Sequence, residues 1–155
     1  MEICVKETKD PKLLAELNHD VQEIHANIEP EIFKRFDKDE MEGLFKEILE
    51  EQEASAYVAY YNGQAAGYIL LAKKEYRETA FKYGYSALYI DQICVQERFR
   101  GKEIGKALME KAKSVSQETG INRIELDFWY KNMNAGQFFR TQGFETYNEK
   151  MFLML

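Results

Sequence analysis

The feature that most constrains the fold is a strand, a basic loop and a helix that follow one another without interruption. Residues 88–95 form an apolar run of strand length, and residues 102–118 carry apolar side chains at helical spacing. Between them lies a loop that contains Arg98, Arg100 and Gly101. Free backbone N–H groups and the positive end of a helix dipole attract anions, and glycine lets the backbone approach them. The segment therefore predicts a site for a phosphate-bearing cofactor, with an ordinary strand-to-helix turn as the alternative.

Glycine spacing excludes two better-known phosphate-binding loops. A P-loop has the pattern Gly-x-x-x-x-Gly-Lys-Ser/Thr. Here three residues separate Gly101 from Gly105, and Ala107 follows Lys106, so no hydroxyl is available for magnesium. The dinucleotide fingerprint needs glycines in the pattern Gly-x-Gly-x-x-Gly, which this loop lacks.

Periodicity and turn residues predict the elements on either side of this loop. Before it we expect a strand at 3–7, a helix that begins after Asp10-Pro11 and ends at Pro30, a helix around 41–49, a hairpin of strands 56–61 and 64–72 joined by Asn62-Gly63, and a polar connection at 73–85. After it we expect a strand at 123–129, a short helix at 135–142 and a last strand at 150–155. The order β-α-α-β-β-β-α-β-α-β-β predicts a single mixed α/β domain of three layers over residues 1–155.

Two linked motifs resemble a known family. Arg100-x-x-Glu103-x-Gly105 is similar to the Gln/Arg-x-x-Gly-x-Gly/Ala loop of the GNAT superfamily of acetyl-CoA-dependent N-acetyltransferases. About thirty residues later, the segment Asn132-x-x-Ala135-x-x-Phe138-Phe139-x-x-x-Gly143-Phe144 resembles the family's Asn-x-x-Ala-x-x-Phe-Tyr-x-x-x-Gly-Phe segment. The resemblance is specific over residues 88–155 and architectural before them. It implies an α/β (α+β) fold with a central mixed, mostly antiparallel sheet flanked by helices.

The resemblance also implies how acetyl-CoA would bind. In the family two neighbouring strands splay apart and pantetheine fills the gap like an extra strand. The residues expected to contact the cofactor here are Ile93, Cys94 and Val95 (backbone, including the oxyanion donor), Arg100, Gly101, Lys102, Glu103, Ile104, Gly105 and Lys106 (pyrophosphate), Asn132 (pantetheine), and Phe138 and Phe139. Glu103 stands where the family's first glycine is usual, so we expect weakened rather than lost CoA binding.

Amide formation requires a neutral amine, although a lysine-like amine has a pKa of about 10.4. Asp91 is the best candidate for the base, because a carboxylate inside an apolar strand has its pKa raised by desolvation. The alternative is that Asp91 caps or hydrogen-bonds a neighbouring loop. Tyr89 and Glu125 are weaker candidates.

The general acid is the main departure from the family. Many members place a tyrosine that protonates the leaving thiolate where this chain has Phe139, which has no proton to give. Tyr130, Tyr147 or water would then serve as the acid. In the alternative, Phe139 only packs with Phe138 and Phe144 and catalysis has been abandoned.

Composition limits the remaining options. A net charge of −6 argues against general nucleic-acid binding, and the acidic region at 29–53 is either a solvated helix face or the entrance for a cationic amine. The sequence shows no leader and no apolar run that would span a membrane, so we expect a cytoplasmic protein. Cys4 and Cys94 are expected to be reduced core residues, and neither they nor His19 and His25 have metal-ligand spacing, so no metal is expected.

These expectations converge on transfer of an acetyl group from acetyl-CoA to a primary amine of a small molecule or peptide, by direct attack on the thioester. The alternative is a CoA-binding sensor or interaction protein with little transferase activity. A protein N-terminus, a lysine side chain, a polyamine and an aminoglycoside all remain open as acceptors, and a homodimer is left open as well.

Overall fold

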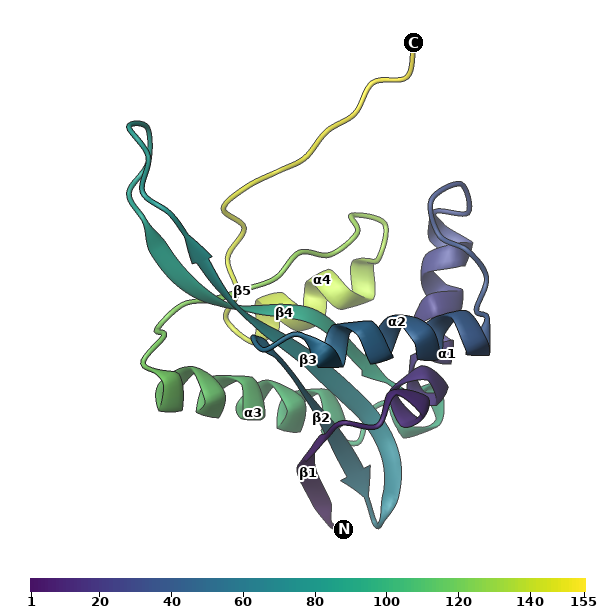
Figure 1. Cartoon of the computed structure of the whole chain (residues 1–155). Helices are drawn as coiled ribbons and strands as arrows, with labels where there is room; N and C mark the ends of the chain where they lie inside the picture. Colours follow the sequence, from purple (N-terminus) through teal and green to yellow (C-terminus); the bar gives the residue numbers. More distant parts are fainter.

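The computed structural model describes residues 1–155 as five strands, four α-helices and one short 3-10 turn (Figure 1). In chain order these are β1 (Ile3–Thr8), α1 (Pro11–Ile28), α2 (Lys38–Glu50), β2 (Ala54–Tyr61), β3 (Gln64–Tyr76), β4 (Tyr85–Val95), η1 (Glu97–Phe99), α3 (Ile104–Thr119), β5 (Ile124–Glu125) and α4 (Met133–Thr141). The strands form one sheet in the order β1-β2-β3-β4-β5. Strands β1 to β4 are antiparallel and β5 joins β4 in parallel, so the predicted mixed, mostly antiparallel sheet is confirmed.

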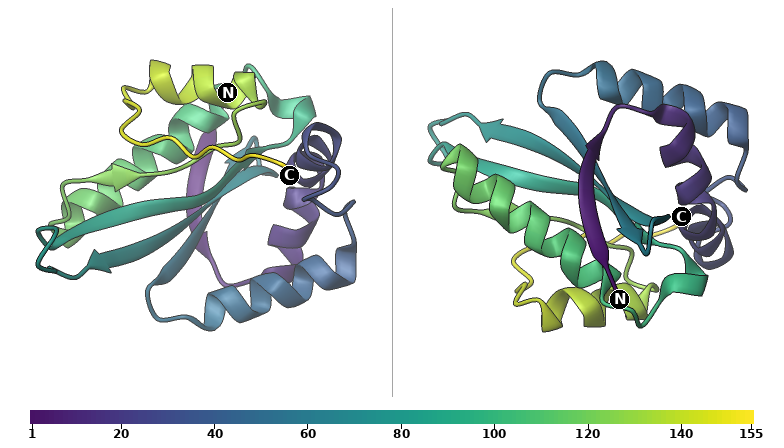
Figure 2. Two further views of the ribbon diagram at one scale, coloured as in Figure 1. Left: turned by 90° about the horizontal axis from the view of Figure 1, so that it is seen from above. Right: turned by 90° about the horizontal axis from the view of Figure 1, so that it is seen from below.

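Helices cover both faces of the sheet, which gives the molecule three layers (Figure 2). Alternate residues of β3 point to opposite faces. Ile69 packs in the core cluster that contains Leu108 of α3, whereas Tyr68 packs in the cluster that contains Leu14 of α1 and Phe45 of α2. None of the helices is both long and apolar enough to cross a membrane.

Local capping and turn signals explain the first half of the chain. The carboxylate of Asp10 accepts hydrogen bonds from the backbone N–H groups of Lys12 and Leu13 at 3.0 and 3.3 Å, which fixes the start of α1 as predicted. Asn62 and Gly63 have positive φ angles of 48° and 83°, as a two-residue hairpin turn between β2 and β3 requires. The predicted first helix and the predicted hairpin are therefore confirmed.

The hairpin between β3 and β4 is longer than predicted. Residues 73–76 and 85–87 belong to the two strands, whereas the sequence analysis assigned residues 73–85 to a polar connection. The ring of Tyr76 stacks on that of Tyr85 with their centroids 4.6 Å apart, and this cross-strand pair holds an extension that is exposed to solvent. The hairpin consequently projects past the helices (Figure 1).

Two predicted strands near the C-terminus were wrong in extent or in existence. The strand predicted at 123–129 is reduced to Ile124–Glu125, and the strand predicted at 150–155 does not form. Residues 145–155 make no backbone hydrogen bond, and Figure 1 shows them projecting away from the sheet. An apolar run shows that a segment can form a strand, but pairing also requires a free neighbouring strand, which a pattern does not reveal.

Candidate functional site

A β-bulge interrupts the middle of β4. The partners of residues 70 and 71 in β3 are Gln92 and Ile90, so Asp91 is an extra residue that has no partner across the ladder. Ile90 and Ile93 both pack into the core beside α3, although residues three apart on a regular strand point to opposite faces. The bulge therefore places Asp91 and Gln92 side by side on the face toward α1 and α2.

Asp91 is accessible to solvent, and no hydrogen bond engages its carboxylate. Desolvation by the surrounding protein is the largest influence and raises the pKa of Asp91. Lys74 lowers this pKa, whereas the carboxylates of Asp127 and Glu51 raise it further. A carboxylate that is exposed and has a raised pKa is suited to accept a proton near neutral pH.

A second carboxylate and a phenol lie next to Asp91. Tyr89 precedes it by two residues on β4, and the Tyr89 hydroxyl donates a hydrogen bond to the carboxylate of Asp127. Burial and this hydrogen bond raise the pKa of Tyr89 well above its usual value, so the phenol keeps its proton. The ammonium of Lys74 lies 3.9 Å from the centroid of the Tyr89 ring. The sequence analysis missed Asp127, although its place between Leu126 and Phe128 was a signal that it points away from the core.

Glu125, a weaker candidate for the base, is already engaged. Its side chain is 4% exposed and forms an ion pair with the guanidinium of Arg123 at 2.6 Å. It also accepts a hydrogen bond from the Tyr85 hydroxyl at 3.2 Å. The structure therefore uses Glu125 to join β5 to the β3–β4 hairpin.

Beyond Tyr89, the edge of β4 that faces β5 has no strand partner. The two strands pair only at Leu88 with Ile124 and at Tyr89 with Glu125. Ile90 and residues 92–95 pair with β3 alone, so the predicted backbone positions Ile93, Cys94 and Val95 lie on an open edge. An open edge can bind an extended ligand through main-chain hydrogen bonds.

The loop that follows β4 contains a run of free backbone donors. No backbone N–H of residues 101–106 donates a hydrogen bond within the protein, and the first N–H in this stretch that does is that of Ala107, to the carbonyl of Glu103. The side chains of Arg100, Lys102 and Lys106 add positive charge to the same loop. Free N–H groups at the start of a helix can bind an anion, and these groups begin a helix of 16 residues, so residues 100–106 are a candidate anion-binding loop.

Glu103 occupies the N-cap position of α3 in a left-handed conformation, with φ at 67° and ψ at 14°. Its side chain is exposed and makes no capping hydrogen bond. Left-handed backbone is strained for every residue except glycine. This explains in physical terms why glycine is the usual residue at the matching family position.

The start of α3 rests on α4. A Cβ atom on Gly105 would come within 3.0 Å of the Phe138 ring, so the glycine permits a close approach of the helix to this side chain. The side-chain oxygen of Asn132 accepts a hydrogen bond from the Ala135 N–H at 3.2 Å and caps α4, which leaves the amide nitrogen of Asn132 free to donate. Residues 132 and 138 therefore lie on the helix that adjoins the candidate anion-binding loop.

Phe139 is in the core rather than in the solvent. It is 6% exposed, and its ring centroid lies 5.6 to 5.9 Å from those of Phe128, Phe138 and Phe144. Of the two tyrosines considered as its replacements, Tyr130 is 92% exposed and Tyr147 is 64% exposed. No hydrogen bond joins either hydroxyl to Asp91 or to the loop at 96–106; Arg123 instead lies 4.9 Å from the Tyr147 ring.

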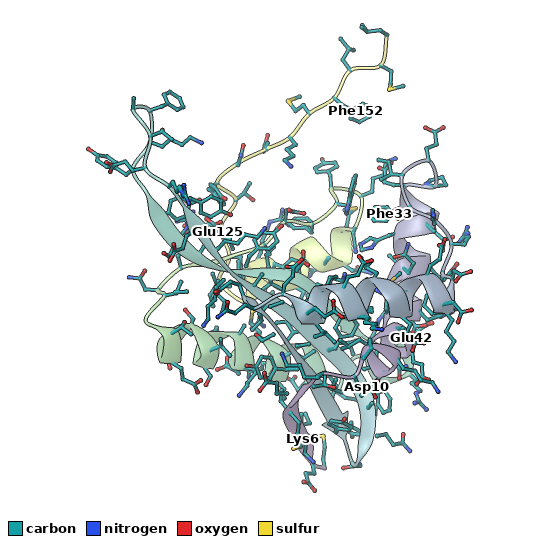
Figure 3. The ribbon with its side chains drawn as sticks, in the orientation of Figure 1. Lys6, Asp10, Phe33, Glu42, Glu125 and Phe152 are labelled. Atoms are coloured by element: carbon teal, nitrogen blue, oxygen red, sulfur yellow. The ribbon has the colours of Figure 1, made fainter.

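The connection between α1 and α2 reaches across to the segment before α4. Phe33 projects from this connection (Figure 3). Its ring stacks on that of His25, with the centroids 4.7 Å apart, and forms an edge-to-face contact with Trp129 at 5.0 Å. The ammonium of Lys131 forms an ion pair with Glu29 at 3.2 Å. These contacts, which no sequence signal indicated, join the acidic region at 29–53 to the loop that follows Asp127.

A buried polar network supports the bulge from inside the core. The amide nitrogen of Asn18 on α1 donates to the Tyr68 hydroxyl at 3.0 Å, and that hydroxyl donates to the side-chain oxygen of Gln92 at 2.5 Å. Nearby, the Cys94 thiol donates to the carbonyl of Leu17 at 3.2 Å, and burial raises the pKa of Cys94 to about 12. Both cysteines are free thiols; Cys94 is buried in the core as predicted, whereas Cys4 on β1 is only half-buried. No group of His, Cys, Asp or Glu side chains is arranged to hold a metal.

Comparison with known proteins gives a consistent result. The model of the acetyltransferase (GNAT) family matches residues 18–144. An uncharacterized N-acetyltransferase of Methanocaldococcus jannaschii is 30% identical over 106 residues, which cover 65% of this chain and 43% of that protein. One from Chlorobaculum tepidum is 31% identical over 96 residues, 62% of this chain and 53% of that protein. The match thus spans about half the length of these relatives.

Solved structures share the fold. The BH1408 protein of Bacillus halodurans, solved as a tetramutant, gives a TM-score of 0.90 at 22% identity over 100% of both chains. The aminoglycoside N-acetyltransferase AAC(6')-Iy, solved in complex with CoA, gives a TM-score of 0.71 at 15% identity over 99% of this chain and 95% of that chain.

Proposed function

Because the chain belongs to the GNAT acetyltransferase family, we propose that it transfers an acetyl group from acetyl-CoA to a primary amine of a small molecule or peptide. The relatives named as N-acetyltransferases support acetyl transfer in general. The single observation that carries the proposal is the open edge of β4 beside the run of free N–H groups at residues 101–106.

Acetyl-CoA would supply the activated thioester carbonyl. The free N–H groups of residues 101–106, together with Arg100, Lys102 and Lys106, would hold its pyrophosphate. The edge of β4 at residues 93–95 would hold the pantetheine by strand addition and donate an N–H to the carbonyl oxygen as negative charge develops on it. The free amide nitrogen of Asn132 would donate to the pantetheine arm. The neighbour AAC(6')-Iy was solved with CoA, which supports the use of this cofactor.

Asp91 would accept the proton that the attacking amine loses, directly or through water. Its accessibility, its raised pKa and the absence of any hydrogen bond to its carboxylate all support this role. Tyr89 and Asp127 lie on the same side of the sheet and would line the approach of the amine.

The leaving thiolate would take its proton from water. Phe139 is buried and has no proton to give, Tyr130 is directed to solvent, and Tyr147 lies against Arg123. A thiol with a pKa of about 8.5 leaves as the thiolate without an acid, so the missing tyrosine slows the reaction less than loss of the base would.

The competing function is a CoA-binding sensor with little transferase activity. Two observations favour it: the buried Phe139 at the position of the acid, and the negatively charged Glu103 in the phosphate loop. Release of thiol from acetyl-CoA, measured with a peptide N-terminus, a lysine peptide, a polyamine and an aminoglycoside, separates the two functions. Turnover with one of the four supports the transferase. An inert protein that is nevertheless stabilised by acetyl-CoA would be the sensor.

Cofactor binding is tested separately by thermal unfolding. Acetyl-CoA at about 100 times its dissociation constant should stabilise the fold by about 2.7 kcal/mol, or roughly 5–10 °C for a chain of this size. The double variant Arg100→Glu/Lys106→Glu should lose most of this shift. Lys111→Glu/Lys113→Glu, farther along α3, is the matched control and should keep it. An unchanged shift in the first variant would refute the phosphate-loop assignment.

A further inference from the structure

The amine of Lys74 lies on the same face of the sheet as the candidate base. Alternate residues of β3 share a face, so Lys74 lies on the side of Tyr68, toward α1 and α2. Its nitrogen is 3.9 Å from the centroid of the Tyr89 ring. Tyr89 pairs with Ala72 across the ladder and shares this face. A lysine amine of the chain itself therefore lies over the ring that precedes Asp91 by two residues.

The charge of Lys74 acts on Asp91. Desolvation is the largest influence on the pKa of Asp91 and raises it, and the ammonium of Lys74 is the next and lowers it. The Tyr89 hydroxyl also donates to the carboxylate of Asp127. No carboxylate forms an ion pair with Lys74. The amine is thus close to a carboxylate but is not fixed by one, and its flexible four-carbon stem leaves it free to move.

Asp91 lies between this lysine and the open edge of β4. Tyr89 comes before Asp91 and Ile93 after it, each two residues away, which is roughly 7 Å along a strand. When the amine moves from Tyr89 toward Asp91, it therefore approaches the unpaired edge at residues 93–95. This is the position that an attacking amine needs, beside a base and next to the thioester.

Two other lysines each share one property with Lys74. Lys73 precedes it on β3 and so points to the opposite face, toward α3. Lys111 lies over the Tyr57 ring at 4.9 Å, a contact of the same kind, but Tyr57 packs against the core cluster beside α3. Neither amine is on the face that carries Asp91. The two are matched internal controls for the reactivity of Lys74.

We propose that the protein acetylates its own Lys74 with the acetyl-CoA bound to the same chain. This inference rests on the proposed transferase function and adds an acceptor that belongs to the chain itself. Asp91 accepts the proton that the ammonium loses and passes it to solvent. The amine nitrogen then bonds to the thioester carbonyl carbon, and the carbon–sulfur bond breaks. The second proton of the nitrogen goes to water, from which the CoA thiolate takes one.

Peptide mass spectrometry tests the site. The full chain is incubated with acetyl-CoA and no added amine, and acetylation of each lysine is followed over time. Lys74 should react at least about ten times faster than Lys73 and Lys111, because its amine lies near a base. Asp91→Asn should slow the reaction at Lys74 by roughly one to three orders of magnitude and leave the spontaneous reaction at the other two unchanged. Equal rates at the three lysines, or a Lys74 rate that Asp91→Asn does not alter, would overturn the proposal.

A dilution series tests whether the reaction stays within one chain. At saturating acetyl-CoA, the first-order rate constant for Lys74 should not depend on the protein concentration. A rate constant that rises with protein concentration would show transfer between colliding molecules and would refute the assignment to the chain's own site.

Thiol release separates this proposal from the proposed function. Without an added amine, the wild type should release a burst of CoA thiol equal in amount to the protein. Lys74→Arg should abolish the burst, since arginine keeps the charge over Tyr89 but is not an amine, and Lys73→Arg should retain it. Turnover of an added amine with Lys74 unmodified would refute this inference alone. Acetylation of Lys74 and of no added amine would refute the proposed acceptor class alone, and a protein that does neither would refute both.

Discussion

Glu103 combines a left-handed backbone with a negative charge at the start of α3. The sequence placed this residue in the phosphate loop and identified the missing glycine. It could not show the φ angle of 67°, because that conformation is imposed by the way the loop enters α3. Glu103 therefore carries two unfavourable terms, backbone strain and repulsion of an anion, and substitutions can separate them.

Glu103→Gln should remove the repulsion of a phosphate while it keeps the backbone strain. Glu103→Gly should remove both. We expect both variants to bind acetyl-CoA about two- to fivefold more tightly, in line with the modest energies of exposed charge pairs. Only Glu103→Gly should also gain stability, by about 1 kcal/mol, because relief of the left-handed strain exceeds the entropic cost of glycine. Titration calorimetry and urea unfolding measure the two effects. Equal affinity of the wild type and Glu103→Gln would mean that the carboxylate points away from the bound anion.

Asp91→Asn should lower the turnover number by roughly one to three orders of magnitude and leave the affinity for acetyl-CoA unchanged. In the wild type, activity should fall as the pH drops through the raised pKa of Asp91, because the base must be ionised. The same raised pKa means that folding favours the protonated carboxyl, so its contribution to stability is present below the usual pKa and is lost as the pH rises through the raised one. Asp91→Asn should therefore melt slightly higher than the wild type at neutral pH. The control is Glu47→Gln, an exposed carboxylate of α2 outside its first turn, which should alter neither the turnover number nor the melting temperature.

At the scale of elements, prediction succeeded where the signal was local. Asp10 caps α1 through its own neighbours, and Asn62-Gly63 forms its turn without outside help. The bulge at Asp91 could not be predicted, because it exists only in the register between two strands. The same holds for the short β5, because its length is set by the two residues over which it pairs with β4. Caps and turns depend on neighbouring residues and can be predicted from the sequence, whereas the register and length of strand pairing cannot.

The Asn18–Tyr68–Gln92 network joins α1, β3 and β4 across sequence separations of 50 and 24 residues. Tyr68→Phe would remove the hydroxyl and leave the buried amide nitrogen of Asn18 and the half-buried side-chain oxygen of Gln92 without this partner. We expect a loss of about 1–3 kcal/mol in the free energy of unfolding, measured with urea. Tyr60→Phe is the matched control on the neighbouring strand β2, since its hydroxyl makes no hydrogen bond, and it should cost less than about 0.5 kcal/mol. Similar losses in both variants would show that the network contributes nothing to stability.

At the scale of the whole molecule, the candidate site lies at the edge of β4, where elements from both faces of the sheet contribute to it. α1 and α2 cover one face of the sheet, and α3 and α4 cover the other (Figure 2). Asp91 lies on the face toward α1 and α2, whereas the candidate anion-binding loop and Asn132 begin α3 and α4. The sequence predicted the helices on both faces and the loop. It could not indicate that Phe33 reaches Trp129, because the two residues are distant in sequence and share no motif. The single-domain organisation of residues 1–155 stays a prediction.

Phe33→Ala should detach the α1–α2 connection from the loop before α4. An aromatic pair of this kind is worth about 0.5–1.5 kcal/mol, so hydrogen exchange in residues 29–37 should become roughly three- to tenfold faster. The emission of Trp129, the single tryptophan of the chain, should shift to longer wavelength as its environment becomes more polar. Phe36→Ala is the control, because Phe36 contacts His19 on α1 and not the loop, and it should leave the emission unchanged. Unaltered emission in Phe33→Ala would contradict the contact.

The order of the strands in the sheet repeats their order along the chain, and this sets a sequence of events for folding. The β2–β3 hairpin closes over the shortest loop, Asn62 and Gly63, and therefore forms at the smallest entropic cost. β4 is added by a second local hairpin, whereas β1 and β5 pair only across longer connections, which contain α1 and α2 in the first case and α3 in the second. The two edges of the sheet are thus costlier to add than its centre, and transient opening of the native state will reach the β5 edge beside Asp91 before it reaches the central β2–β3 hairpin.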